Sequence, residues 1–116
     1  MNVLSDKRVK RFAGPTIGTE TGVKATNEEL PGGAIVTGIF YEATTAFEGT
    51  GGSADLRVGG TIVKTGAIIT EIGANVKSRD MNASSKIGAT GGAIDFNVTT
   101  AFTVGALGDV IIEYVV

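Results

Sequence analysis

The most concentrated charge in this sequence lies in its first eleven residues. Lys7, Arg8, Lys10 and Arg11 stand there against one acid, so this stretch carries a net charge of +3 while the whole chain carries −2. Such a run can bind the phosphates of a nucleic acid, dock on an acidic protein surface, or stay solvated. The remainder is acidic, whereas nucleic-acid binders usually present a basic folded face. We therefore expect no nucleic-acid partner, and the other two interpretations stay open.

Carboxylates are the second group that could do chemistry, because glycoside hydrolysis needs two of them flanking a bond. Eight are spread between Glu42 and Glu113. Glu42, Asp95 and Glu113 fall on the outward phase of expected strands, which is typical of solvated positions. Asp80 or Asp109 could offer calcium its oxygen ligands, but no EF-hand spacing is present. We expect no catalytic residue and no metal site.

The chain contains neither Cys nor His. Their absence removes Ser-His-Asp and Cys-His nucleophiles and nearly every zinc, copper, haem or iron–sulfur site. The glycine-rich stretch 49–52 lacks the Lys-Ser/Thr and the following helix of a P-loop, so it is interpreted as a turn between strands. The sequence thus predicts a protein that is not an enzyme and has no cofactor.

Apolar residues nowhere form the uninterrupted stretch of a secretory signal or the roughly 20-residue run of a membrane helix. We expect no membrane partner and synthesis without an export signal.

From Ala34 onward the sequence has the composition and alternation of strands. The expected strands are 34–47, 54–58, 61–64, 67–72, 93–102 and 110–116, with a weak one at 86–89 inside a long polar loop, 73–92. Several short strands separated by glycine turns are typical of an all-β protein, an antiparallel β-sandwich or jelly roll.

One sequence motif, the repeated phrase, occurs twice in this strand-rich part. IFYEATTAF at 39–47 returns as IDFNVTTAF at 94–102, with the alternating apolar positions kept. We interpret the two copies as equivalent strands in two halves of the fold, each directing its apolar side chains to a shared core. Coincidence is the alternative, because TTAF consists of common strand residues.

The first 33 residues have no strong period. Val3, Leu4, Val9 and Phe12 would share one side of a short helix, which Gly14-Pro15 would end because proline disfavours helix in the residue before it. Pro31-Gly32-Gly33 is a hinge signal. We predict two parts, an extended N-terminal arm at 1–33 and a β-sandwich domain at 34–116.

Three apolar side chains are candidates for an interface between subunits. Ile111 and Val115 fall on the outward phase of the last strand, and Phe40 lies on the phase opposite to its two neighbours. A small chain with a thin core gains apolar burial by associating with copies of itself. Phe40, Ile111 and Val115 are therefore the predicted oligomer interface.

Two segments carry a resemblance to a known group of proteins. One is a strand ending in TTAF, followed by a glycine turn and a short Asp-Leu-Arg-Val strand; the other is the closing sequence from Val98 to Val116. Together they resemble small structural proteins of tailed bacteriophages, particularly capsid decoration (cement) proteins. The likeness covers about Ile35–Val116. It implies β-sandwich or jelly-roll units that form trimers on the shell and often grip it with an N-terminal arm.

Carried over by position, the resemblance implies that the arm residues contact the capsid: Lys7, Arg8, Lys10, Arg11 and Phe12. It implies two partners, a major capsid protein and further copies of the chain in a homotrimer. The implied location is the capsid surface of a virion assembled in the cytoplasm of a bacterial host.

The first hypothesis is accordingly a non-enzymatic decoration protein that stabilises a phage capsid by bridging its subunits. A virion-surface module that binds a host glycan or receptor is the second, with the polar loop Asn75–Ser85 as its candidate site. A head-to-tail connector or tail protein is the third.

Overall fold

The computed structural model contains strands and connecting segments throughout the part of the chain that it describes. The described residues are 7–17, 19–43, 52–69, 76–78, 81–82, 87–88, 91–102 and 108–116. The strands are β1 (Lys7–Ala13), β2 (Gly22–Leu30), β3 (Ile35–Ala43), β4 (Ser53–Val58), β5 (Thr61–Ile69), β6 (Val76–Ser78), β7 (Gly92–Thr100) and β8 (Gly108–Val115).

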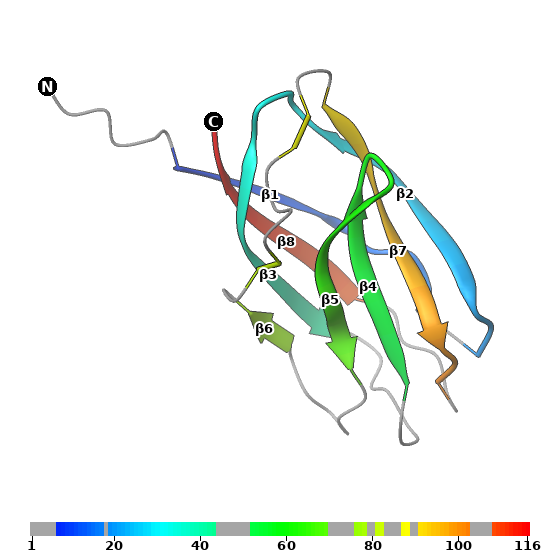
Figure 1. The fold of residues 1–116 in the computed structure, drawn as a ribbon. Helices are drawn as coiled ribbons and strands as arrows, with labels where there is room; N and C mark the ends of the chain where they lie inside the picture. Colours follow the sequence, from blue (N-terminus) through cyan, green and yellow to red (C-terminus); the bar gives the residue numbers. More distant parts are fainter. Residues whose placement is uncertain are drawn as a thin grey trace, which may run out of the picture.

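These strands form two four-stranded sheets, ordered β1-β8-β3-β6 and β2-β7-β4-β5 (Figure 1). β1 pairs with β8, β2 with β7, β3 with β6 and β4 with β5, all antiparallel, as in one long hairpin. Rolling that hairpin up adds the pairings β3 with β8 and β4 with β7. The result is the eight-stranded jelly roll, so the prediction of an all-β antiparallel sandwich or jelly roll is confirmed.

The core lies between the two sheets and is built from alternating positions of the central strands. In β7, Ile94, Phe96 and Val98 are buried, whereas Asp95 and Asn97 between them are only half-buried. Successive side chains of a strand point to opposite faces, so this alternation directs the apolar set inward. The buried apolar residues are Ile17, Leu30, Ala34, Val36, Ile39, Tyr41, Ala54, Leu56, Val58, Val63, Ala67, Ile87, Ile94, Phe96, Val98, Phe102, Val110 and Ile112.

The repeated phrase occupies one central strand in each sheet. Its first copy begins in β3 and its second in β7, and Ile39, Tyr41, Ile94 and Phe96 all lie in one core cluster. Both copies therefore direct their apolar side chains to the shared core, as the interpretation of the repeat expected. The Thr-Thr-Ala-Phe ending of the first copy lies outside the described residues.

The N-terminal segment is part of the sandwich, which corrects the prediction of an arm outside it. Residues 7–13 form β1 at the edge of one sheet, and residues 22–30 form β2 at the edge of the other. Ile17, between them, is fully buried. The expected short helix is also wrong, because residues 7–13 are paired along their whole length with β8.

Residues 61–69 form one strand rather than the two expected. Thr65-Gly66, predicted as a turn, lies where the register between β4 and β5 shifts, and Gly66 has φ = +63°. The Asp55 carboxylate accepts a hydrogen bond from the Gly66 N–H at 2.7 Å. The turn signal thus marks a β-bulge, a feature that glycine with positive φ accommodates.

The long loop expected at 73–92 contains β6, which pairs with β3. Of the weak strand expected at 86–89, only Ile87 and Gly88 are described, and neither is in a strand. Ile87 is buried and donates its N–H to the Ala34 carbonyl at 2.6 Å. Across the described ranges, no helix is long and apolar enough to cross a membrane.

Candidate functional site

The outer face of the β1-β8-β3-β6 sheet gathers most of the residues that the sequence singled out. On β8, Val110 and Ile112 point into the core, so Asp109, Ile111 and Glu113 point outward. On β3, Phe40 stands opposite Ile111 in the ladder. On β1, the residues of the same phase are Lys7, Val9, Arg11 and Ala13. We refer to this surface as the outer face of the first sheet.

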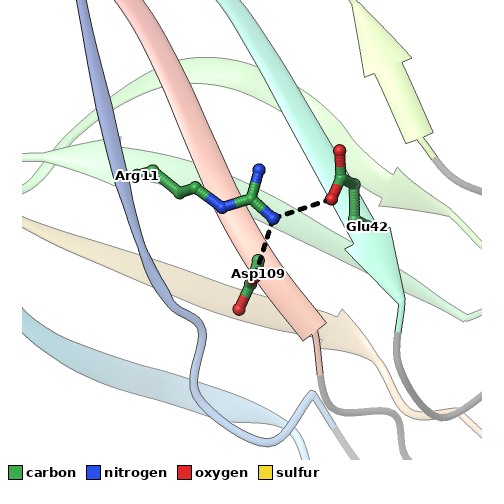
Figure 2. A network of polar contacts seen from close by, with 3 residues as sticks. All are labelled: Arg11, Glu42 and Asp109. Carbon is green, nitrogen blue, oxygen red and sulfur yellow. Dashed lines mark hydrogen bonds and ion pairs between the residues drawn. The ribbon is translucent and has the colours of Figure 1, made fainter.

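Arg11 forms a charge cluster that ties three strands together on this face (Figure 2). Its guanidinium Nη2 lies 2.9 Å from Glu42 Oε2 on β3 and 2.8 Å from Asp109 Oδ2 on β8. The hydrogen bonds to Glu42 and to Asp109 raise the pKa of Arg11 above its ordinary value. In Figure 2 the side chain extends from β1 across the β8 ribbon toward the end of β3.

A second charged group lies on the same face. Lys7 Nζ is 3.4 Å from Glu113 Oε2, and the Thr37 hydroxyl donates to Glu113 Oε1 at 3.1 Å. Glu113 is only 7% exposed although it is on the outward phase. A carboxylate buried to this degree needs both a counter-charge and hydrogen bonds, and these two neighbours supply them.

The other residues predicted to contact a capsid point to the opposite side of β1. Lys10 Nζ lies 3.2 Å from Glu28 Oε1, which joins β1 of one sheet to β2 of the other. Phe12 is half-buried and packs against the core, while Arg8 is exposed. The basic run is therefore divided between two sides of a strand, and Lys7, Lys10 and Arg11 contact carboxylates of the same chain.

Apolar side chains occupy the positions between these charged groups. Phe40, Ile111 and Val115, the predicted oligomer interface, all lie on this face and are half-buried. Val9, 62% exposed, and Ile35, 39% exposed, extend the set to β1 and to the start of β3. Sequence reasoning missed these two because it assigned no strand to residues 7–13 and did not assign Ile35 to a face.

The outer face of the second sheet has a different character. Its centre holds an ion pair in which Arg57 Nε is 2.7 Å from Asp95 Oδ1 and Nη2 is 3.1 Å from Oδ2. The hydrogen bond to Asp95 is the main cause that raises the pKa of Arg57. Asp55 and Asn97 stand opposite each other beside the pair. This centre is polar, whereas the first face sets Phe40 opposite Ile111 between its charged clusters.

Several of the carboxylates considered for catalysis form ion pairs with basic side chains of the same chain. Glu42, Asp95 and Glu113 lie on outward positions, as expected, and each contacts a basic side chain, but Glu113 is buried rather than solvated. Asp109 belongs to the Arg11 cluster, and Asp80 lies outside the described residues. In the described part of the chain, no three acidic side chains come together to hold a metal ion.

The polar loop considered for glycan binding is only partly described. Asn82 donates its side-chain amide to the Thr65 hydroxyl at 2.9 Å and accepts from the Thr65 N–H at 3.2 Å. These bonds hold the loop to β5. An open depression of about 610 Å³ lies elsewhere, at the connection from β1 to β2. Its lining consists of Pro15, Thr16, Thr19, Glu20, Val23, Lys24 and Ala25.

Comparison with known proteins identifies two solved structures with this fold. A chain in "Cyanophage Pam1 capsid asymmetric unit" superposes with a TM-score of 0.64 at 18% identity, covering 97% of this chain and 86% of that one. A chain in "Capsid of Ralstonia phage GP4" gives 0.55 at 16% identity, covering 99% and 88%. No protein-family model matches the sequence, and a search of curated proteins finds no match. At these identities the likeness shows a shared fold.

Proposed function

We propose that this chain is a non-enzymatic structural protein of a bacteriophage virion, which decorates the capsid and stabilises it by bridging capsid subunits as a trimer. One observation carries the proposal: the fold matches chains of two phage capsids over nearly the whole of this chain. Fold alone does not imply function. The proposal therefore also draws on the resemblance of residues 35–116 to phage decoration proteins.

The first outer face adds physical support. It has a mixed apolar and charged character, which suits a surface that is covered in an assembly. A small sandwich that binds a lattice in many copies compensates for modest single-site affinity by avidity. Binding to the assembled shell then stabilises that shell by mass action.

The capsid contact is proposed to include the basic strand β1. Lys7, Lys10 and Arg11 already contact acids of their own chain, so their charges are partly compensated before any partner binds. Contacts of this kind between exposed charges weaken in salt. Arg8→Ala removes one of the four charges of β1 and should weaken binding to the capsid; Lys24→Ala on β2 is the matched control, and circular dichroism checks that both variants fold.

Pelleting with capsid shells tests the function. Shells assembled from the major capsid protein of the same virus should carry the chain into the pellet and should melt at a higher temperature when it is bound. A chain that stays in the supernatant at saturating concentration, and leaves the melting temperature of the shells unchanged, would contradict the proposal.

A further inference from the structure

We propose that β1 is a releasable strand, which detaches as one unit while the rest of the sandwich stays folded. Release turns residues 7–13 from the edge of the first sheet into an extended basic segment. The inference goes beyond the proposed function and does not depend on it, because it concerns the free chain alone.

The burial of β1 is the first argument. Each of its seven residues is exposed or half-buried, and Phe12 packs against the core from a half-buried position. In contrast, β2, β3, β4, β5, β7 and β8 each contribute at least one residue to the buried core. Burial of apolar surface is the dominant favourable term in folding. β1 therefore gains less from its place in the sandwich than these strands do.

The pairing of the strands is the second argument. β1 stands at the end of its sheet, next to β8. β8 is also paired on its other side with β3, from Ile35 to Ala43, and its Val110 and Ile112 lie in the core. Release of β1 breaks one ladder and leaves the other seven strands with the neighbours that they have in the closed form.

The ion pairs of β1 are the third argument. Lys7, Lys10 and Arg11 contact carboxylates on β8, β2 and β3, and their side chains are 61%, 30% and 53% exposed. Ion pairs at such exposure contribute little to stability and weaken in salt, so they add little to the cost of release. Release separates these cations from their carboxylates, and the open segment then presents its basic side chains to a partner.

The connection after β1 sets the limit of release. Ile17 is fully buried and belongs to the part that stays folded. Pro15 has no N–H to donate, and the Gly14 N–H donates to the Gly108 carbonyl at 2.8 Å. The hydrogen bond of Gly14 is thus the last that release breaks, and residues 14–16 form the hinge.

Hydrogen exchange of the full chain, followed residue by residue by NMR at constant pH, tests the inference. The amides that bond β1 to β8, on both strands, should share one protection factor. It should be at least about tenfold lower than the protection factor of the β7 amides, because a local unit opens at a lower free energy than the whole domain.

A covalent lock supplies the matched control. Lys7 stands opposite Val115 in the ladder, and residues opposite each other in an antiparallel pair are close enough for a disulfide. The chain contains no Cys, so the double variant Lys7→Cys, Val115→Cys can form a single disulfide within one chain. Its oxidised form should raise the protection of the β1 amides to the level of β7. Its reduced form should exchange at least as fast as the natural chain.

Three results would overturn the inference. The first is protection in β1 equal to that in β7, which means that β1 opens only when the whole chain unfolds. The second is protection that rises steadily from Lys7 to Ala13 without a match on β8, which is fraying of a chain end. The third is equal exchange of β1 in the oxidised and reduced forms of the double variant.

Discussion

Tyr41 shows how a single residue couples the core to the charged outer face. It lies on β3, points inward and is fully buried. Burial, and then the negative charge of Asp109 on the neighbouring strand, raises the pKa of the Tyr41 phenol to about 12. The neutral phenol is therefore favoured more strongly in the folded chain than in the unfolded chain, where its pKa is about 10.

This difference predicts a loss of stability in strong base. The folded state holds the Tyr41 proton more tightly, so its contribution is complete below pH 10 and is lost as the pH rises from about 10 to 12. The loss should be on the order of 2–3 kcal/mol. Urea unfolding of the natural chain and of Tyr41→Phe across this range measures it. The variant should lose less stability than the natural chain, and parallel curves would show that Tyr41 does not ionise in this way.

Because Gly92 has no side chain, β7 can approach the turn between β4 and β5 closely. A Cβ atom at this position would lie 2.6 Å from both the Cα and the N of Gly59, which are backbone atoms that cannot rotate away. Gly59 also donates its N–H to the Ala93 carbonyl at 2.9 Å. The close contact therefore belongs to the pairing of β7 with this turn.

Gly92→Ala should consequently lower the free energy of unfolding by more than about 2 kcal/mol, because the added Cβ would force the backbone of β7 away from that of the turn. Gly88→Ala is the control, because a Cβ there meets nothing within 4 Å. Denaturant unfolding of both variants measures their free energies of unfolding. Equal midpoints for the two would mean that β7 and the turn separate freely.

At the scale of elements, β1 is the strand whose role in the fold differs most from the role that its sequence predicted. It is joined to β8 by a seven-residue ladder, to the core by Phe12, and to both sheets by ion pairs. Sequence reasoning treated this segment as part of an extended arm outside the sandwich. In the jelly roll, removing it would leave β8 as an unpaired edge.

Deleting residues 1–13 should thus destabilise the chain by more than about 2 kcal/mol, a large share of the 5–15 kcal/mol typical of a domain. A deletion of residues 1–6 alone keeps β1 and serves as the control. Thermal melting of the two truncated chains gives the comparison. If the longer deletion melted at the temperature of the full chain, the segment would be an arm outside the sandwich, as the sequence suggested.

The pattern of the central strands made half of this fold predictable. Ile94, Phe96 and Val98 alternate with polar residues, so β7 was visible in the sequence. β2 was not, because its half-buried positions hold Lys24, Thr26 and Glu28 while Val23 is exposed. An edge strand can carry polar side chains on its inner side, since water still reaches them.

The charged clusters could not be predicted for a different reason. The partners of Arg11 are 31 and 98 positions away in the chain, and only the rolled hairpin brings them together. The apolar outward residues Phe40, Ile111 and Val115 were visible because strand phase is a local property. Their placement on one face with Val9 required the pairing of β1 with β8.

At the scale of the whole molecule, the two sheets present different surfaces to their surroundings. The face of β2-β7-β4-β5 is polar at its centre, and the face of β1-β8-β3-β6 combines apolar side chains with compensated charges. Under the proposed function, the chain would turn one of these faces toward its neighbours and the other toward solvent.

A density map of the capsid with the chain added tests this account most directly. Shells reconstructed with and without the purified chain should differ by additional density on the outer surface that fits two four-stranded sheets. Shells that are identical in the two maps, at a chain concentration sufficient to saturate them, would contradict the account.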